Sequence, residues 1–231
     1  MNMKNDLIAI FDLDGTLIDT IGDLAAAVEN ALSRNGFPRH TVEEYRKMVG
    51  HGIRNLVTRA LPEGVSEETI DTVLRDFVEY YTAHIDVLSR PYPGIHGLLQ
   101  DLTSAGVKLA VTSNKFQAGT EMLIGRFFPD IPFVRILGNA PGLPLKPDAA
   151  VVRLAMDAAE TQRGVLVGDS ATDIRTAHNA GIPAIAVSWG FRPKSDLAAA
   201  EAVADSVEEL SNLIFEYLSG NSSLNSCGRQ G

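Results

Sequence analysis

The feature that most constrains this chain is a short apolar run that ends abruptly at two aspartates. Residues 7–11 (LIAIF) contain no polar side chain, which is typical of a β-strand buried on both faces. Strands of this kind belong to parallel sheets whose two faces are covered by helices. Because Asp12, Asp14 and Gly15 follow directly, such a strand would deliver two carboxylates to one edge of the sheet.

The remaining chain divides into a helical segment and an alternating segment. From Asp23 to about Leu88 no comparable strand occurs, and apolar residues recur at helical spacing, with Asp23 as the predicted N-cap of the first helix. After the turn sequence at residues 91–94 (PYPG), helices alternate with mostly apolar strands. The later strands are predicted at residues 108–112, 133–137, 165–167 and 183–187, and further helices at residues 42–49, 53–61, 66–84, 95–104, 117–126, 147–159, 171–179 and 207–218.

This alternation predicts an α/β fold, a Rossmann-like parallel sheet core with a small helical cap inserted after the first strand. The core would consist of residues 1–18 and 89–220, and the cap of residues 19–88. Residues 221–231 are polar and glycine-rich, which predicts a flexible tail.

Composition limits the class of protein, its partners and the compartment in which it occurs. With 45% hydrophobic and 21% charged residues, the chain resembles an ordinary globular protein and not a disordered, collagenous or coiled-coil one. Its net charge of −9 argues against a nucleic-acid partner. No apolar stretch reaches the roughly 18 residues of a membrane helix, and the N-terminal sequence lacks a signal-peptide cleavage site. The single cysteine, Cys227, cannot form an internal disulfide, which is typical of a protein in the reducing cytoplasm. We therefore expect a cytoplasmic protein. We also expect a monomer or homodimer without a membrane partner.

Polar side chains follow several of the predicted strands. In open parallel sheets, ligands bind beyond the carboxyl ends of the strands, so these segments should converge on one crevice. The residues that would meet there are Asp12, Asp14, Ser113, Asn114, Lys146, Asp169 and Asp173.

This set of residue types points to phosphate chemistry. Carboxylates that lie close together repel one another, and Mg²⁺, which prefers hard oxygen ligands, removes the difficulty. One of the two aspartates Asp12 and Asp14 could attack phosphorus while the other delivers a proton. Lys146 and the Ser113 hydroxyl could stabilise the phosphoryl oxygens, helped by helix N-termini predicted after Asn114 and Ser170. Any one of these aspartates could instead be a helix cap, but such caps do not explain four polar segments in this order.

Four ordered motifs, FDLDGTLIDT, TSN, LKPD and GDSATD, resemble those of the haloacid dehalogenase superfamily of phosphatases. The resemblance implies that Asp12 is the nucleophile, which becomes an aspartyl-phosphate, and that Asp14 is the general acid and base. It also implies that Ser113 and Asn114 hold phosphoryl oxygens and that Lys146 stabilises both nucleophile and phosphoryl group. Thr112 could replace Ser113 in the second motif, but Ser113 is chosen because Asn114 follows it.

The same resemblance implies a Mg²⁺ site. Asp12 and Asp169 would be ligands, and Asp14 would contribute its backbone carbonyl. Asp173 would hold the shell of groups around the cation in place. Asp14 also separates this chain from true dehalogenases, which expel halide and generally lack the second aspartate.

The substrate is expected to be a small phosphorylated metabolite. The segments DLAAAVENAL and VGHGIRNLVTRAL look most like those of phosphoglycolate phosphatases, which implies hydrolysis of 2-phosphoglycolate. In the second segment, Arg54 and His51 could contact the substrate carboxylate, or could lie on a solvated cap helix. A phosphosugar mutase and a pyrophosphatase of the same superfamily remain alternatives, and a receiver-type signalling domain is a third possibility that Asp14 and the cap disfavour.

Overall fold

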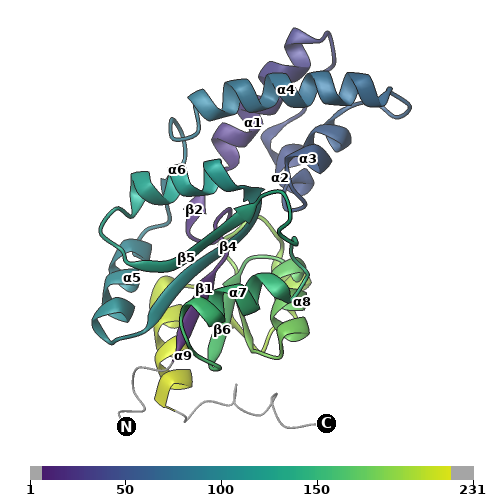
Figure 1. Cartoon of the computed structure of the whole chain (residues 1–231). Helices are drawn as coiled ribbons and strands as arrows, with labels where there is room; N and C mark the ends of the chain where they lie inside the picture. The colour runs from purple at the N-terminus through teal and green to yellow at the C-terminus, as the bar shows by residue number, and fades with distance from the viewer. Residues whose placement is uncertain (1–6, 220–231) are drawn as a thin grey trace.

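A six-stranded parallel sheet forms the centre of the computed structural model, which describes residues 7–219 (Figure 1). Its strands lie in the order β5-β4-β1-β6-β7-β8, so the first strand of the chain occupies an interior position. The predicted α/β class is therefore confirmed. The strands are β1 (Ile8–Phe11), β4 (Lys108–Phe116), β5 (Phe133–Asn139), β6 (Gly164–Gly168), β7 (Ala184–Val187) and β8 (Ala202–Ala204).

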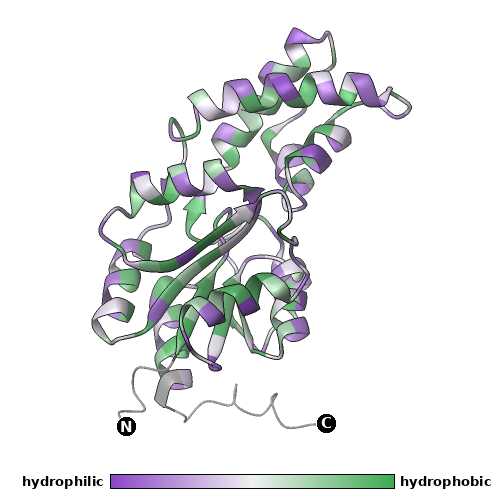
Figure 2. Cartoon of the chain, in the orientation of Figure 1, coloured by the Kyte–Doolittle hydropathy of each residue, from purple (hydrophilic) through white to green (hydrophobic). Residues whose placement is uncertain are grey.

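Helices cover both faces of this sheet. Successive side chains of a strand point to opposite faces, and in β1 Ile8 and Ile10 pack in one buried cluster while Ala9 and Phe11 pack in the other. The first cluster includes α7 (Ala150–Ala158), α8 (Ala171–Ala180) and the short 3₁₀ helix η2 (Lys194–Leu197). The second includes α5 (Ile95–Ser104), α6 (Gln117–Phe127) and α9 (Val207–Ser219). Figure 2 shows the strands as largely hydrophobic and the helices as mixed, as expected for helices with one face on the core.

Four helices lie beyond the carboxyl ends of β4 and β5 (Figure 1). They are α1 (Ile21–Arg34), α2 (Val42–Met48), α3 (Ile53–Ala60) and α4 (Glu67–Ala83), and α1 packs against α4 and α2. The two connections between these helices and the sheet pair as a short antiparallel ladder of β2 (Ile18–Asp19) and β3 (Arg90–Pro91). The exact domain boundaries stay a prediction. No helix among the described residues is long and apolar enough to cross a membrane.

The prediction that Asp23 caps the first helix is wrong. The helix begins at Ile21 with Thr20 at the N-cap, and Asp23 lies buried in the first turn. The Asp23 carboxylate accepts hydrogen bonds from the backbone N–H groups of Leu88 and Ser89 and from the Ser89 hydroxyl, at 2.7–3.0 Å. Asp23 therefore joins the outgoing and returning connections, a partnership across 65 residues that local sequence cannot reveal.

One further prediction needs correction, and one strand was missed. The strand expected to end at residue 112 continues to Phe116, so Ser113 and Asn114 belong to β4, and the next helix begins at Gln117 as predicted. The three residues of β8 were not predicted, because the alanine-rich sequence around Ala202 favours a helix by composition. Pairing with β7 makes them a strand.

Candidate active site

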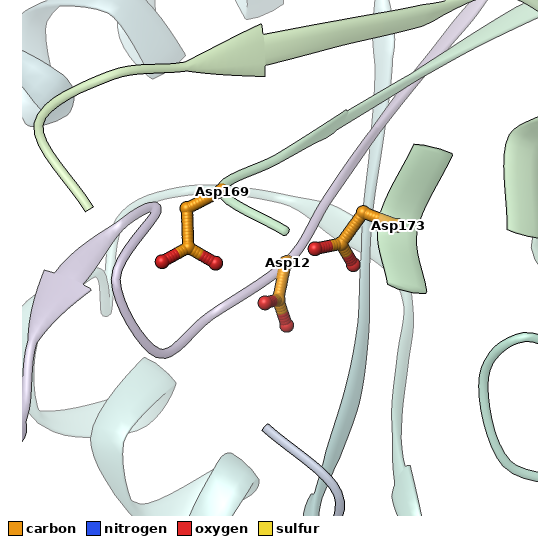
Figure 3. Close-up of side chains that lie close together, drawn as sticks. All are labelled: Asp12, Asp169 and Asp173. Atoms are coloured by element: carbon orange, nitrogen blue, oxygen red, sulfur yellow. The ribbon is translucent and has the colours of Figure 1, made fainter. Parts of the chain in front are cut away.

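Three carboxylates meet where two neighbouring strands end. Asp12 follows β1, Asp169 follows β6, and Asp173 lies in the first turn of α8. Because β1 and β6 pair in parallel, their carboxyl ends lie side by side. Each residue offers an oxygen within 4.8 Å of the others, and all three side chains are buried (Figure 3). The structure thus brings together three of the residues that the sequence predicted to converge.

Lys146 supplies the positive charge at this cluster. Its Nζ lies 2.7 Å from an Asp12 oxygen and 2.6 Å from an Asp173 oxygen, and its side chain is only 4% exposed. The amide of Asn114 positions the Lys146 backbone: its Oδ1 accepts from Lys146 N–H at 2.9 Å, and its Nδ2 donates to Lys146 C=O at 3.1 Å. The Asn114 side chain therefore positions Lys146, and because Asn114 also lines the cavity, its expected contact with phosphoryl oxygens stays a prediction.

Asp173 is also part of the helix cap. Ser170 and Asp173 form a capping box, in which the Asp173 Oδ2 accepts from the Ser170 N–H at 3.1 Å and from its hydroxyl at 2.6 Å. The other Asp173 oxygen accepts from Lys146. The expected helix N-terminus after Ser170 is confirmed, and Ser170 and Thr172 both line the adjacent cavity.

Asp169 fits because two glycines leave room for it. Gly15 adopts a left-handed conformation with φ of +84°, and a side chain at Gly15 or Gly190 would overlap the Asp169 carboxylate. The backbone N–H of Phe191 donates to Asp169 Oδ2 at 2.6 Å. The loop after β7 and the turn after β1 therefore hold this carboxylate from two sides.

Burial shifts the acid–base equilibria of the cluster. Burial raises the pKa of Asp169 to about 7, and the neighbouring Asp173 adds to the shift. Burial also raises the pKa of Asp12 well above its usual range, against the opposing attraction of Lys146. For Lys146, burial alone would lower the pKa, but Asp12 and Asp173 outweigh it and the pKa rises. One ammonium among three buried carboxylates leaves excess negative charge, and these hard oxygen donors fit a divalent cation such as Mg²⁺.

The pKa of Asp169 predicts how Mg²⁺ should affect stability. Without a cation, the folded protein binds more protons than the unfolded chain between about pH 4 and pH 7, so stability falls as the pH rises through this window. A bound cation favours the ionised carboxylates, so millimolar Mg²⁺ should raise Tm by roughly 3–6 °C at pH 8 and by less at pH 5. Thermal unfolding in MgCl₂ against EDTA, with NaCl at matched ionic strength, measures this. Equal shifts at both pH values, or the same shift with NaCl, would contradict the prediction.

Asp14 lies beside this cluster and has partners that the sequence did not suggest. Its carboxylate accepts from the Thr20 hydroxyl at 2.6 Å and from Lys115 Nζ at 3.1 and 3.4 Å. Lys115 is buried and also donates to the hydroxyl of Tyr81 at 2.6 Å. Tyr81 belongs to α4, so this chain of contacts joins the helical segment to the sheet. Sequence reasoning missed Lys115, although it stands next to the second motif.

Ser113 and Thr112 are the two candidates for the hydroxyl of the second motif, and they lie in different surroundings. Ser113 lines the cavity, and its Oγ accepts from the Lys115 N–H at 3.2 Å. Thr112 is fully buried, and its hydroxyl has no hydrogen-bond partner among the described residues. Position alone therefore favours Ser113 for contact with a ligand.

A cavity of about 600 Å³, including solvent space at its mouth, lies over these groups. The helical segment forms one wall of this cavity, with Val49, Gly50, Gly52, Ile53 and Leu56.

The structure does not bring Arg54 to this cavity. Its guanidinium lies 2.5 Å from carboxylate oxygens of both Glu67 and Asp71, on the exposed surface of the helical segment. His51 is exposed and does not line the cavity either. Arg192, which sequence reasoning missed, does line it.

The fold and the acidic site together define a class of α/β protein that gathers buried carboxylates at the carboxyl ends of parallel strands. Residues 9–187 match the model of the family described as haloacid dehalogenase-like hydrolase, and the chain belongs to that family. The resemblance inferred from the four motifs is confirmed.

Individual relatives agree with this assignment. The chain is 34% identical to phosphoglycolate phosphatase of Agrobacterium fabrum over 218 residues, covering 91% of this chain and 93% of that protein. A crystal structure from Lactobacillus delbrueckii subsp. bulgaricus is 33% identical with a TM-score of 0.85, covering 93% of this chain and 99% of that one. CbbY from Rhodobacter sphaeroides, crystallised in complex with phosphate, is 25% identical with a TM-score of 0.76, covering 89% and 96%.

Proposed function

We propose that this protein is a Mg²⁺-dependent phosphomonoesterase that hydrolyses 2-phosphoglycolate to glycolate and phosphate. The observation that carries the proposal is the placement of Asp12. It is a buried carboxylate at the end of an interior strand, paired with Lys146 at 2.7 Å and facing a cavity. The relative from Agrobacterium fabrum, which bears the name phosphoglycolate phosphatase, supports the choice of substrate.

In the first step, an Asp12 oxygen attacks phosphorus and the bond between phosphorus and the ester oxygen breaks. The product is an aspartyl-phosphate and an alkoxide leaving group. Lys146 lies where it can balance charge on both the carboxylate and the transferred phosphoryl group. The Ser113 hydroxyl, which lines the same cavity, would donate to a phosphoryl oxygen.

Asp14 serves both steps as the proton carrier. It lines the cavity two residues after Asp12, gives its proton to the leaving alkoxide, and then accepts a proton from the attacking water. That water breaks the aspartyl-phosphate bond, releases phosphate and regenerates the Asp12 carboxylate. The contacts of Asp14 with Thr20 and Lys115 hold its carboxylate at the cavity wall between these events.

The ligands of Mg²⁺ would be Asp12, Asp169 and the Asp14 backbone carbonyl. Asp173 would orient the groups around these ligands through its contacts with Lys146 and Ser170. When bound, the cation would neutralise negative charge on the phosphoryl oxygens and on the buried carboxylates.

Phosphate release from a panel of phosphate compounds, with and without Mg²⁺, tests the function. The panel contains 2-phosphoglycolate, hexose phosphates, nucleotides and pyrophosphate, and each reaction is repeated in EDTA. We expect Mg²⁺-dependent release with a clear preference for 2-phosphoglycolate, because the helical segment closes one side of the cavity and limits the room for the leaving group.

The other outcomes separate the alternatives. A preference for pyrophosphate or for sugar phosphates would retain the chemistry and overturn the substrate. Transfer of phosphate between sugar hydroxyls without release, followed by phosphorus NMR, would identify a mutase. A long-lived phosphorylated protein with negligible release would favour the signalling alternative.

A further inference from the structure

The cavity wall contains three cations with different partners. Lys146 contacts the carboxylates of Asp12 and Asp173, and Lys115 contacts that of Asp14. The guanidinium of Arg192 contacts only backbone carbonyls among the described residues. Arg192 is therefore the lining cation whose charge no contacting carboxylate neutralises.

Arg192 lies between the core and the helical segment. It follows Phe191, whose N–H holds Asp169, on the loop after β7. Its Nη1 donates to the carbonyls of Arg46 at 3.1 Å and Lys47 at 3.4 Å, and its Nη2 donates to that of Val49. The first two carbonyls belong to the last turn of α2, the negative end of that helix.

These contacts leave Arg192 able to bind a ligand. A guanidinium has five N–H donors, and the three carbonyl contacts use three of them. A side chain at Gly50 would lie 3.0 Å from Arg192 Nη2, so glycine at this position keeps the approach open. Arg192 thus faces the cavity with its position fixed and donors to spare.

Other cations lie on the same side of the cavity as Arg192, although the whole chain carries a net charge of −9. Although the His51 side chain is largely exposed, its pKa is lowered by some desolvation of the ring and by the positive charges of Arg192, Arg59 and Arg175. A guanidinium that contacts no carboxylate among the described residues can attract a second anionic group on a ligand whose phosphate is bound at Asp12 and Lys146.

We propose that Arg192 determines specificity by binding the carboxylate of the leaving group. The planar fork of a guanidinium matches the two oxygens of a carboxylate. This inference rests on the proposed function and gives Arg192 the role that the sequence had suggested for Arg54, whose guanidinium is already paired with Glu67 and Asp71.

The test compares two esters that differ at the carboxylate. They are 2-phosphoglycolate and 2-hydroxyethyl phosphate, in which a neutral hydroxymethyl group replaces the carboxylate. The Arg192→Gln variant should lose about 10- to 100-fold in kcat/KM for 2-phosphoglycolate, mainly through KM, and less than about threefold for 2-hydroxyethyl phosphate. Arg192→Lys, which keeps the charge, should recover part of the preference.

Matched variants show whether the effect belongs to this position. Arg54→Gln removes the rival guanidinium, and Arg153→Gln removes an exposed one on α7. We expect both to keep the wild-type preference between the two esters. Thermal unfolding of every variant shows whether loss of the contacts to α2 has loosened the fold.

Several results would overturn the inference. Equal losses of Arg192→Gln on both esters would show that Arg192 only holds the helical segment in place. A lost preference in Arg54→Gln would return the role to that residue. Absence of a preference in the wild type would refute both the Arg192 inference and the choice of 2-phosphoglycolate, while Mg²⁺-dependent hydrolysis of 2-hydroxyethyl phosphate would leave the phosphatase function intact. No hydrolysis of either ester would refute the function itself.

Discussion

The Asp12→Asn variant should lose phosphatase activity by at least about 10⁴-fold in kcat while it keeps the fold. An amide nitrogen and a neutral amide oxygen are poor nucleophiles, so no aspartyl-phosphate can form. The shape of the side chain hardly changes, and Lys146 can still donate to the amide oxygen that replaces its 2.7 Å partner. The loss should therefore fall on the chemical step and not on packing.

Steady-state phosphate release, with circular dichroism as the check on folding, measures this effect. Asp157→Asn, which changes an exposed aspartate on α7 in the same way, serves as the control and should keep wild-type rates. A second measurement traps the phosphorylated protein by acid quench and mass spectrometry. Phosphorylation of the Asp12→Asn protein, or retention of more than about a tenth of the activity, would show that another residue is the nucleophile.

The Lys146→Met variant should lose about 3–5 kcal/mol of unfolding free energy at neutral pH, along with its activity. Lys146 is the shared partner of Asp12 and Asp173 at 2.7 and 2.6 Å, and its side chain is 4% exposed. Removing the ammonium leaves buried carboxylates without their cation. A methionine fills the same space without creating a large cavity, so the loss reflects electrostatics more than packing.

Urea unfolding in EDTA at pH 5 and pH 8 tests this cause. Unpaired buried carboxylates have raised pKa values, so the folded variant takes up protons that the unfolded chain does not. Its deficit against the wild type should therefore be smaller at pH 5 and larger at pH 8. Lys194→Met breaks an exposed ion pair with Asp205 at 2.6 Å and should change stability little at either pH. A pH-independent deficit for Lys146→Met would point to packing instead.

The sheet and the core of the site could be predicted because they depend on local patterns. A strand buried on both faces needs an unbroken apolar run, and all four residues of β1 are fully buried. The polar residues that end β1 and β6 must then meet, because parallel neighbours end at the same edge. Asp12, Lys146, Asp169 and Asp173 accordingly lie together as their positions in the sequence suggested.

The contacts of the charged side chains at the edge of the site depend on residues far away in the sequence. The sequence suggested Arg54 as the cation for the substrate and did not suggest Arg192, but Arg54 is held by Glu67 and Asp71 while Arg192 lines the cavity. Likewise, Asp23 has the composition of a helix cap, yet its carboxylate binds the backbone of Leu88 and Ser89. The positions of strands and helices follow from hydrophobic periodicity along the chain, whereas the partner of a charged side chain depends on which distant residue the packing places within about 3 Å of it. Periodicity is a property of neighbouring residues, and such a distance exists only once the whole chain has folded.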